Sequence, residues 1–167
     1  MEPQSVDIRT QPHRAVRQQR SRALRVVIVE DSERILTHLA EQLSAIDNVC
    51  IAGTAATEAQ ALQLLAQGNW DLAILDLQLK EGNGLRVLKA IREEARAVGT
   101  IAVFTNYAFP QYRKRSLELG ADYFFDKARE LPRIVALAGD MAGTATNRCL
   151  TDKPIGTSAS RGPPRDS

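Results

Sequence analysis

The chain has 167 residues and a mass of 18.4 kDa, with 44% hydrophobic and 25% charged residues, the size and composition of one globular domain. No apolar run approaches the roughly 20 residues needed to span a bilayer, and no apolar stretch follows the first arginines as a secretory signal requires. The net charge of +2 is uneven, because residues 1–25 hold six arginines against Glu2 and Asp7.

Residues 1–23 carry prolines, glutamines and arginines but almost no large apolar side chains. Such a segment buries too little apolar surface to offset the entropy of ordering it, so we predict a flexible basic arm. This arm either contacts a nucleic acid or an acidic partner by charge, or has no specific role. Residues 142–167 are rich in Gly, Thr, Ser, Pro and Arg without periodicity, which predicts a disordered tail.

Between these two segments, apolar β-branched runs alternate with apolar residues at helical spacing. The runs predict strands at residues 24–29, 49–55, 72–75, 100–105 and 123–126. The helical spacing predicts helices at residues 32–46, 57–67, 85–97, 110–119 and 131–141. The fourth helix has few large apolar residues, so we expect it to be held loosely to the sheet.

Five strands alternating with five helices predict an α/β fold in three layers, with helices on both faces of a parallel sheet. A flavodoxin-like strand order, 2-1-3-4-5, and a Rossmann-like order both satisfy this alternation. The third strand is apolar throughout, as central strands are, and it ends at Asp76 before a loop with Gly82 and Gly84. A single aspartate in this position is more often a turn residue than a functional one.

Four of the five predicted strands end at polar side chains, namely Glu30 with Asp31, Asp76, Thr105, and Asp126 with Lys127. The carboxyl ends of parallel strands share one edge, so we expect these groups to converge. Three carboxylates there would repel one another by about 4 kcal/mol per pair at about 4 Å and an effective dielectric of about 20. Lys127 is monovalent, so a divalent cation such as Mg²⁺ is expected among them.

These positions make the chain resemble the response-regulator receiver domain of bacterial two-component signalling, over residues 24–141. The resemblance rests on Glu30–Asp31, on Asp76 within DLQLKEGNG, on Thr105, and on Lys127 within GADYFFDK. It implies the flavodoxin-like order 2-1-3-4-5. We expect a stand-alone receiver domain, because residues 142–167 are too few for an appended helix-turn-helix domain.

The resemblance also implies a role for each acid. Asp76 would accept a phosphoryl group from a phospho-histidine donor, in a two-component system or phosphorelay. Glu30, Asp31 and Asp76 would hold Mg²⁺ together with the backbone carbonyl of Gln78.

Three further residues would read the phosphoryl group. Thr105 and Lys127 would contact its oxygens and neutralise their charge. Phe124 would be the aromatic switch, moving inward as Thr105 turns toward the phosphoryl group, although an ordinary core aromatic is an equal alternative. The covalent charge would then change the surface of the fourth helix and fifth strand.

The chain departs from the family pattern at three positions. Lys80 stands where a proline is common, so the turn after Asp76 has no ring to fix it. Ala128 replaces the proline after Lys127, which removes the usual cis peptide. Phe124 lacks a phenolic hydroxyl. In addition, we expect Tyr107 to hinder the water that hydrolyses the acyl phosphate.

The implied partners are a histidine kinase or phosphotransfer protein and a downstream protein that the sequence does not name. We expect no membrane contact, no DNA binding by the folded domain, and a dimer that forms on phosphorylation. Two alternatives are an adaptor that acts without phosphorylation and a DNA-associated regulator that uses the arginine-rich arm.

An enzyme is disfavoured, apart from self-phosphorylation and dephosphorylation. Aspartyl-phosphate hydrolases would need a DxD motif where this chain has VEDSE, and a Rossmann dehydrogenase would need GxGxxG there. Cys50 and Cys149 match no metal-binding spacing, so we expect reduced thiols and a cytoplasmic location.

Overall fold

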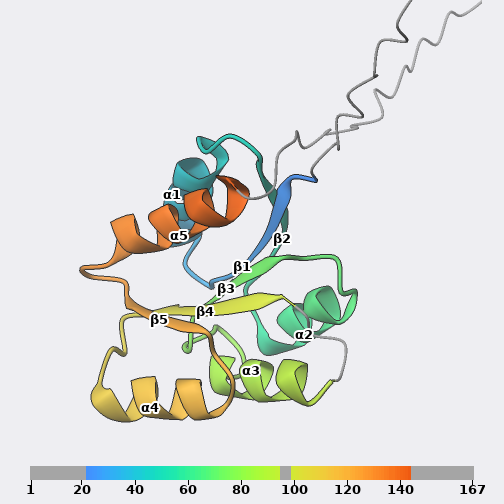
Figure 1. The fold of residues 1–167 in the computed structure, drawn as a ribbon. Coiled ribbons are helices and arrows are strands. Elements are labelled where there is room, and N and C mark those ends of the chain that lie inside the picture. Colours follow the sequence, from blue (N-terminus) through green and yellow to red (C-terminus); the bar gives the residue numbers. More distant parts are fainter. Residues whose placement is uncertain (1–21, 95–98, 144–167) are drawn as a thin grey trace, which may run out of the picture.

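The computed structural model describes residues 22–94 and 99–143, which form a five-stranded parallel sheet with helices on both faces (Figure 1). The elements are β1 (Leu24–Val29), α1 (Glu33–Ser44), β2 (Val49–Ala55), α2 (Glu58–Ala66), β3 (Leu72–Leu75), α3 (Gly84–Glu93), β4 (Thr100–Thr105), α4 (Pro110–Glu118), β5 (Tyr123–Asp126) and α5 (Leu131–Gly143). The strand order is β2-β1-β3-β4-β5, which confirms the flavodoxin-like alternative. Residues 1–21 of the predicted arm and 144–167 of the predicted tail lie outside the described residues.

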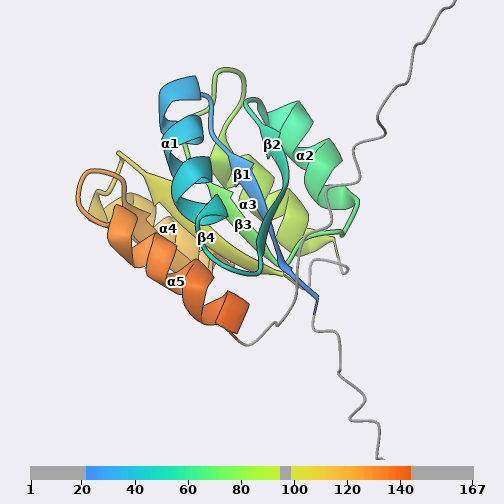
Figure 2. The same cartoon turned by 90° about the horizontal axis from the view of Figure 1, so that it is seen from above.

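Two apolar layers hold the helices to the sheet. Helices α1 and α5 cover one face, while α2, α3 and α4 cover the other (Figures 1 and 2). The first layer includes Leu39, Leu43, Ile134 and Ala138, and the second includes Ala61, Leu65, Leu88 and Ile91. β3 is buried along its whole length between these layers, as its uninterrupted apolar sequence predicts.

The strand register brings the predicted polar residues to one edge. Val29, Leu75 and Val103 lie side by side on β1, β3 and β4, so the residues that follow them emerge together. The backbone N–H of Asp76 donates to the carbonyl of Val29 at 2.9 Å, which places Asp76 beside Glu30. The polar residues that end these strands therefore meet at the carboxyl end of the sheet.

Side-chain caps fix where the helices at this edge begin. Ser32, Thr57 and Asn83 each accept a hydrogen bond from a backbone N–H in the first turn of α1, α2 and α3. Each cap satisfies one of the N–H groups that a helix start leaves without a partner. The caps also stand directly after the strand-end loops, so they set the shape of those loops.

Several helix boundaries differ from those expected. α1 ends at Ser44, because the chain reverses through Asn48, whose φ of 64° lies in the left-handed region. α3 ends at Glu93, where the next residue is already extended. α5 continues to Gly143 because Ala142 is buried in the core.

Two smaller expectations were wrong. Ala23, which the sequence placed in the arm, is buried, and Arg22 forms an ion pair with Asp71. Cys50 is disulfide-bonded rather than a reduced thiol.

In the part of the chain that the structure describes, no helix is long and apolar enough to cross a bilayer. The same residues contain no cis peptide bond, in agreement with Ala128 in place of proline.

Candidate functional site

Asp76 lies at the centre of the carboxyl edge and is only 6% exposed. Its Oδ1 accepts a hydrogen bond from the backbone N–H of Gln78 at 3.2 Å, and its Oδ2 accepts one from Nζ of Lys127 at 2.5 Å. Gly84 packs directly against this residue: a Cβ at Gly84 would lie 2.0 Å from the carbonyl oxygen of Asp76. The first residue of α3 must therefore be glycine for the loop to close over Asp76.

Lys127 bridges two buried carboxylates. Its ammonium group pairs with Glu30 as well as with Asp76, and all three side chains are less than a tenth exposed. The other oxygen of Glu30, Oε1, accepts the backbone N–H of Ser32 at 3.0 Å. Burial raises the pKa of Glu30 above its ordinary value, although the hydrogen bonds from Lys127 and Ser32 act against this shift.

Asp31 completes an acidic cluster at the solvent side of the site. One carboxylate oxygen from each of Glu30, Asp31 and Asp76 lies within 4.8 Å of the others. Three negative charges face the single positive charge of Lys127, so the site carries an excess of negative charge. An all-oxygen donor set of this charge suits a hard divalent cation such as Mg²⁺, which keeps several of its waters.

Thr105 ends β4 next to this cluster and is completely buried. Its Oγ1 accepts the backbone N–H of Tyr107 at 3.2 Å, and its carbonyl accepts the backbone N–H of Lys127 at 3.0 Å. The second of these bonds ties the ends of β4 and β5 together. The hydroxyl is held by the loop that leads into α4, which links the site to that helix.

Phe124 lies one strand away and is already inside the core, at 5% exposure. The Arg113 guanidinium on α4 lies over its ring, 4.7 Å from the centroid, and donates to its carbonyl at 3.2 Å. In the described conformation the ring is therefore buried and covered by a charged side chain. The sequence offered no signal for Arg113, because it meets Phe124 only through the packing of α4 on β5.

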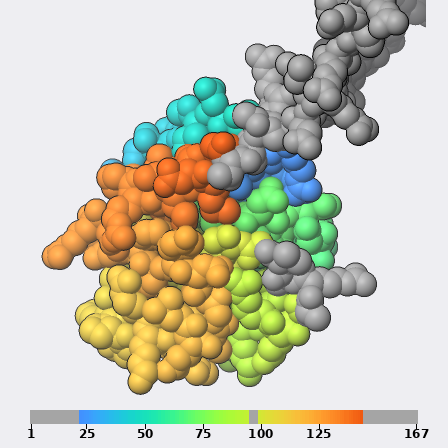
Figure 3. Space-filling model, viewed as in Figure 1, coloured from blue at the N-terminus to red at the C-terminus, as the bar shows by residue number. Residues whose placement is uncertain are grey.

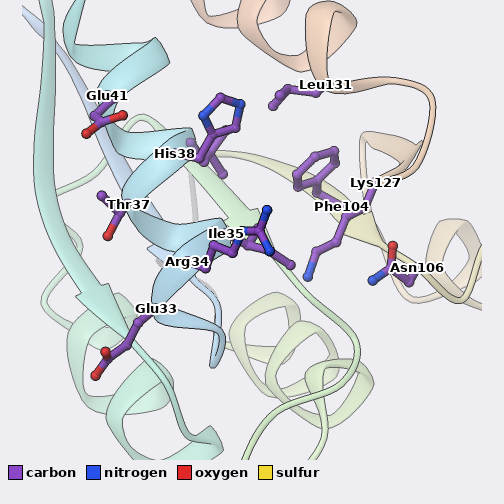
Figure 4. Close-up of a pocket in the computed structure, with 11 residues that line it drawn as sticks. Glu33, Arg34, Ile35, Thr37, His38, Glu41, Phe104, Asn106, Lys127 and Leu131 are labelled. Carbon is purple, nitrogen blue, oxygen red and sulfur yellow. The ribbon is translucent and has the colours of Figure 1, made fainter.

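A cavity of about 760 Å³ opens between α1 and the residues at the ends of β4 and β5 (Figure 4). His38 and Arg34 of α1 line one side, and Phe104, Asn106 and Lys127 line the other. His38 is exposed. Lys127 reaches both this cavity and Asp76, so the cavity adjoins the same strand edge.

Sequence reasoning missed the contacts that hold the loop after β3. Glu58, the first residue of α2, accepts the backbone N–H of Asn83 at 2.8 Å across 25 positions of sequence. An acid in the first turn of a helix is a common stabilising feature, so nothing in the pattern distinguished Glu58 from a helix-dipole contact.

The sequence matches the response regulator receiver domain over residues 26–138. Protein-glutamate methylesterase/protein-glutamine glutaminase 1 of Methanospirillum hungatei is 29% identical over 137 residues, which cover 79% of this chain and 40% of that protein. Nitrate/nitrite response regulator protein NarL of Escherichia coli is 25% identical over 146 residues, covering 78% of this chain and 67% of that protein. The chain thus spans about two fifths to two thirds of the length of these two curated relatives.

Solved structures share the same fold. A response regulator signal receiver domain from Mycobacterium tuberculosis superposes with a TM-score of 0.66 and 25% identity, covering 73% of this chain and 98% of that chain. The response regulator domain of Thermotoga maritima CheB superposes with a TM-score of 0.63 at 18% identity, covering 74% and 96%. The second likeness concerns the fold alone.

Proposed function

The chain belongs to the response regulator receiver domain family, and from this premise we propose that Asp76 is its phosphoacceptor in a two-component system or phosphorelay. The observation that carries the proposal is the buried arrangement of Asp76 between Lys127 and the carboxylates of Glu30 and Asp31. A lone turn aspartate would need neither a buried lysine nor two neighbouring acids.

The proposed step is a phosphoryl transfer without oxidation or reduction. The bond between phosphorus and an imidazole nitrogen of a phospho-histidine donor breaks, and a bond between phosphorus and a carboxylate oxygen of Asp76 forms. The electron pair of the broken bond stays on the imidazole, which takes up a proton. Because β3 is buried along its length and Gly84 packs against the backbone of Asp76, the carboxylate is held in one position for this attack.

The neighbouring side chains would neutralise the charge that builds up on the phosphoryl oxygens. Lys127 supplies a fixed positive charge at this edge, and the Thr105 hydroxyl is a donor that can turn toward the phosphoryl group. Glu30, Asp31, Asp76 and the backbone carbonyl of Gln78 are the proposed ligands of Mg²⁺. A bound Mg²⁺ would supply further neutralisation of the phosphoryl oxygens.

The proposed output is a change in the surface of α4 and β5. Rotation of Thr105 would alter the loop that it anchors through Tyr107 and would move Phe124, so α4 would present a different face to a partner. In the space-filling view α4, β5 and α5 form one continuous surface (Figure 3). We infer that this surface contacts a downstream protein or a second copy of the chain after phosphorylation.

Incubation of the full chain with Mg²⁺ and a small-molecule phosphodonor tests the proposal, read by intact mass. We expect one phosphoryl adduct on the wild-type chain and none on Asp76→Asn. Asp71→Asn is the matched control, because Asp71 lies at the opposite end of β3, where it binds Arg22 and the backbone N–H of Arg25.

The adduct should persist in the Asp71→Asn variant. An unmodified wild-type chain, under conditions that modify a known receiver domain, would contradict the proposed function and favour an adaptor that acts without phosphorylation.

A further inference from the structure

The loop between β3 and α3 carries the proposed backbone ligand, Gln78, but has no proline to stiffen it. Lys80 and Gly82 both leave the backbone free to adopt several conformations. A metal ligand must nevertheless be held in one place for its site to be preorganised. The rigidity of this loop therefore has to come from contacts outside it.

Those contacts come from the start of α2. Oε2 of Glu58 accepts the backbone N–H of Asn83 at 2.8 Å, and the backbone N–H of Glu58 donates to the carbonyl of Glu81 at 2.9 Å. Thr57 also forms a parallel bridge with Glu81. The start of α2 thus holds the loop at two nearby residues, Glu81 and Asn83, through both its backbone and the Glu58 side chain.

The backbone conformation of Gly82 makes room for the Glu58 side chain. Its φ is 93°, a conformation that other residues rarely adopt, and a Cβ there would lie 2.2 Å from Cβ of Glu58. The absence of a side chain at Gly82 lets the Glu58 side chain cross the loop and reach Asn83. The contact between Glu58 and Asn83 therefore depends on glycine at position 82.

The loop passes this constraint on to the site. Asn83 and Gln78 face each other in an antiparallel bridge, and the backbone N–H of Gly84 donates to the carbonyl of Leu77 at 2.9 Å. The backbone N–H of Gln78 in turn donates to Asp76. A continuous chain of contacts runs from Glu58 through Asn83 to Gln78 and the phosphoacceptor.

We propose that Glu58 is a positioning residue, which fixes the loop through Asn83 and thereby sets the backbone carbonyl of Gln78 for Mg²⁺. This inference rests on the proposed function, because it assumes that the acidic cluster holds Mg²⁺. It goes beyond that function in assigning part of the metal affinity to a helix that contributes no metal ligand.

Titration of the full chain with Mg²⁺ alone, by calorimetry without a phosphodonor, tests the inference. Removing partners that orient metal ligands typically costs about 10- to 100-fold in affinity, and we expect Glu58→Ala to lie at about the lower end. Glu58→Gln keeps an oxygen that can accept the Asn83 N–H, so it should restore affinity to within about threefold of wild type. Hydrogen exchange at the Asn83 amide should accelerate in Glu58→Ala and be protected again in Glu58→Gln.

Glu81→Gln is the matched control, because it removes a charge from the same loop while Glu81 serves Glu58 through its backbone carbonyl. Its affinity for Mg²⁺ should stay within about twofold of wild type. An equal loss in Glu81→Gln and Glu58→Ala would overturn the inference, since charge alone would then explain both.

Two other results have distinct meanings. If wild-type chain binds Mg²⁺ and forms the phosphoryl adduct but Glu58→Ala retains wild-type affinity, the inference is wrong and the proposed function stands. If the wild-type chain neither binds Mg²⁺ nor forms the adduct, the proposed function fails and the inference fails with it.

Discussion

Lys127 is the residue on which the electrostatics of the site depend. It is buried between Glu30 and Asp76, and its ammonium group contacts both carboxylates. A buried ion pair contributes little compared with an apolar replacement, but removal of one partner leaves an uncompensated buried charge. In this site, two carboxylates would be left without their shared cation.

We predict that Lys127→Met lowers the free energy of unfolding by about 3 kcal/mol at about pH 7 in the absence of Mg²⁺. Burial raises the pKa of Glu30 in the folded protein, so its protonated form favours folding. That contribution is present below the unfolded pKa and is lost as the pH rises through the folded pKa. The loss caused by Lys127→Met should therefore shrink as the pH falls toward about 5.

Urea denaturation at the two pH values measures this difference. Lys80→Met is the control, because Lys80 is an exposed lysine in the neighbouring loop. A loss of equal size at both pH values would contradict the role assigned to the buried carboxylates.

We propose that Tyr107 limits the access of water to a phosphoryl group on Asp76. Its backbone is tied to Thr105, and its ring meets Tyr112 edge to face at 6.0 Å while remaining 37% exposed. The two rings share a small pocket with Gln78. A bulky ring at this position would narrow the approach of a hydrolysing water.

We predict that Tyr107→Ala accelerates loss of the phosphoryl adduct by about tenfold, equivalent to about 1.4 kcal/mol of barrier. The rate is measured by intact mass after removal of the phosphodonor. Tyr123→Ala, which truncates an exposed tyrosine on β5, should leave the rate unchanged. An unchanged rate in Tyr107→Ala would mean that the ring does not shield the acyl phosphate.

At the scale of elements, α4 makes few apolar contacts with the sheet, and Tyr112 is its main residue packed against the core. Ser116 is its only fully buried residue, as the weak apolar pattern of this helix predicts. Arg113 instead spans from α4 to Phe124 on β5 and lies 3.9 Å from Glu130, just before α5. So small a buried apolar contact costs little free energy to break, which supports the proposal that α4 changes position on phosphorylation.

Glu130 pairs with arginines from both α4 and α5. Its pKa is lowered, first by the hydrogen bond from the backbone N–H of Asp126 and then by Arg133 and Arg113. A carboxyl whose pKa is lower in the folded protein stabilises the fold above its unfolded pKa. This contribution is lost as the pH falls through the folded pKa.

We predict that Glu130→Gln lowers the free energy of unfolding by about 0.5–1 kcal/mol at about pH 7, the range of partly exposed ion pairs. The difference from wild type should shrink as the pH falls below the unfolded pKa and vanish below the lowered pKa of Glu130 in the folded protein. Thermal unfolding followed by circular dichroism across this range tests it. Glu118→Gln, on the exposed end of α4, is the control. A difference that persists in acid would contradict the assignment.

At the scale of the whole molecule, the sheet brings residues that are far apart in the sequence next to one another. Glu30 and Lys127 are far apart in the chain, yet they touch because β1, β3, β4 and β5 end at one edge. The resulting excess of negative charge should disfavour folding until a cation binds. Metal binding and folding are therefore expected to be coupled.

We predict that Mg²⁺ raises the unfolding temperature of the full chain, by an amount equivalent to about 2.7 kcal/mol at about 100 times its dissociation constant. Asp31→Asn should reduce this shift, because Asp31 is an exposed member of the acidic cluster. Asp71→Asn should lower the unfolding temperature without Mg²⁺ but keep the shift. An equal shift in wild type and Asp31→Asn would place the cation elsewhere.

The sequence alone determined the alternation of strands and helices and the residues that end each strand. The strands begin and end where the apolar runs do, because the sequence signal for a strand depends only on neighbouring residues. The helix ends were less predictable, since Asn48 and Ala142 respond to how the chain turns and packs.

Only the tertiary structure decided how the site is held. The features that hold the site all join residues distant in sequence. They are the strand order, the buried ion pair of Glu30 with Lys127, the packing of Arg113 over Phe124 and the hydrogen bond from Asn83 to Glu58. Such contacts depend on which helix packs over which strand, and no local pattern encodes that. The sequence therefore named the chemical groups of the site, whereas packing set the charge balance and rigidity under which they act.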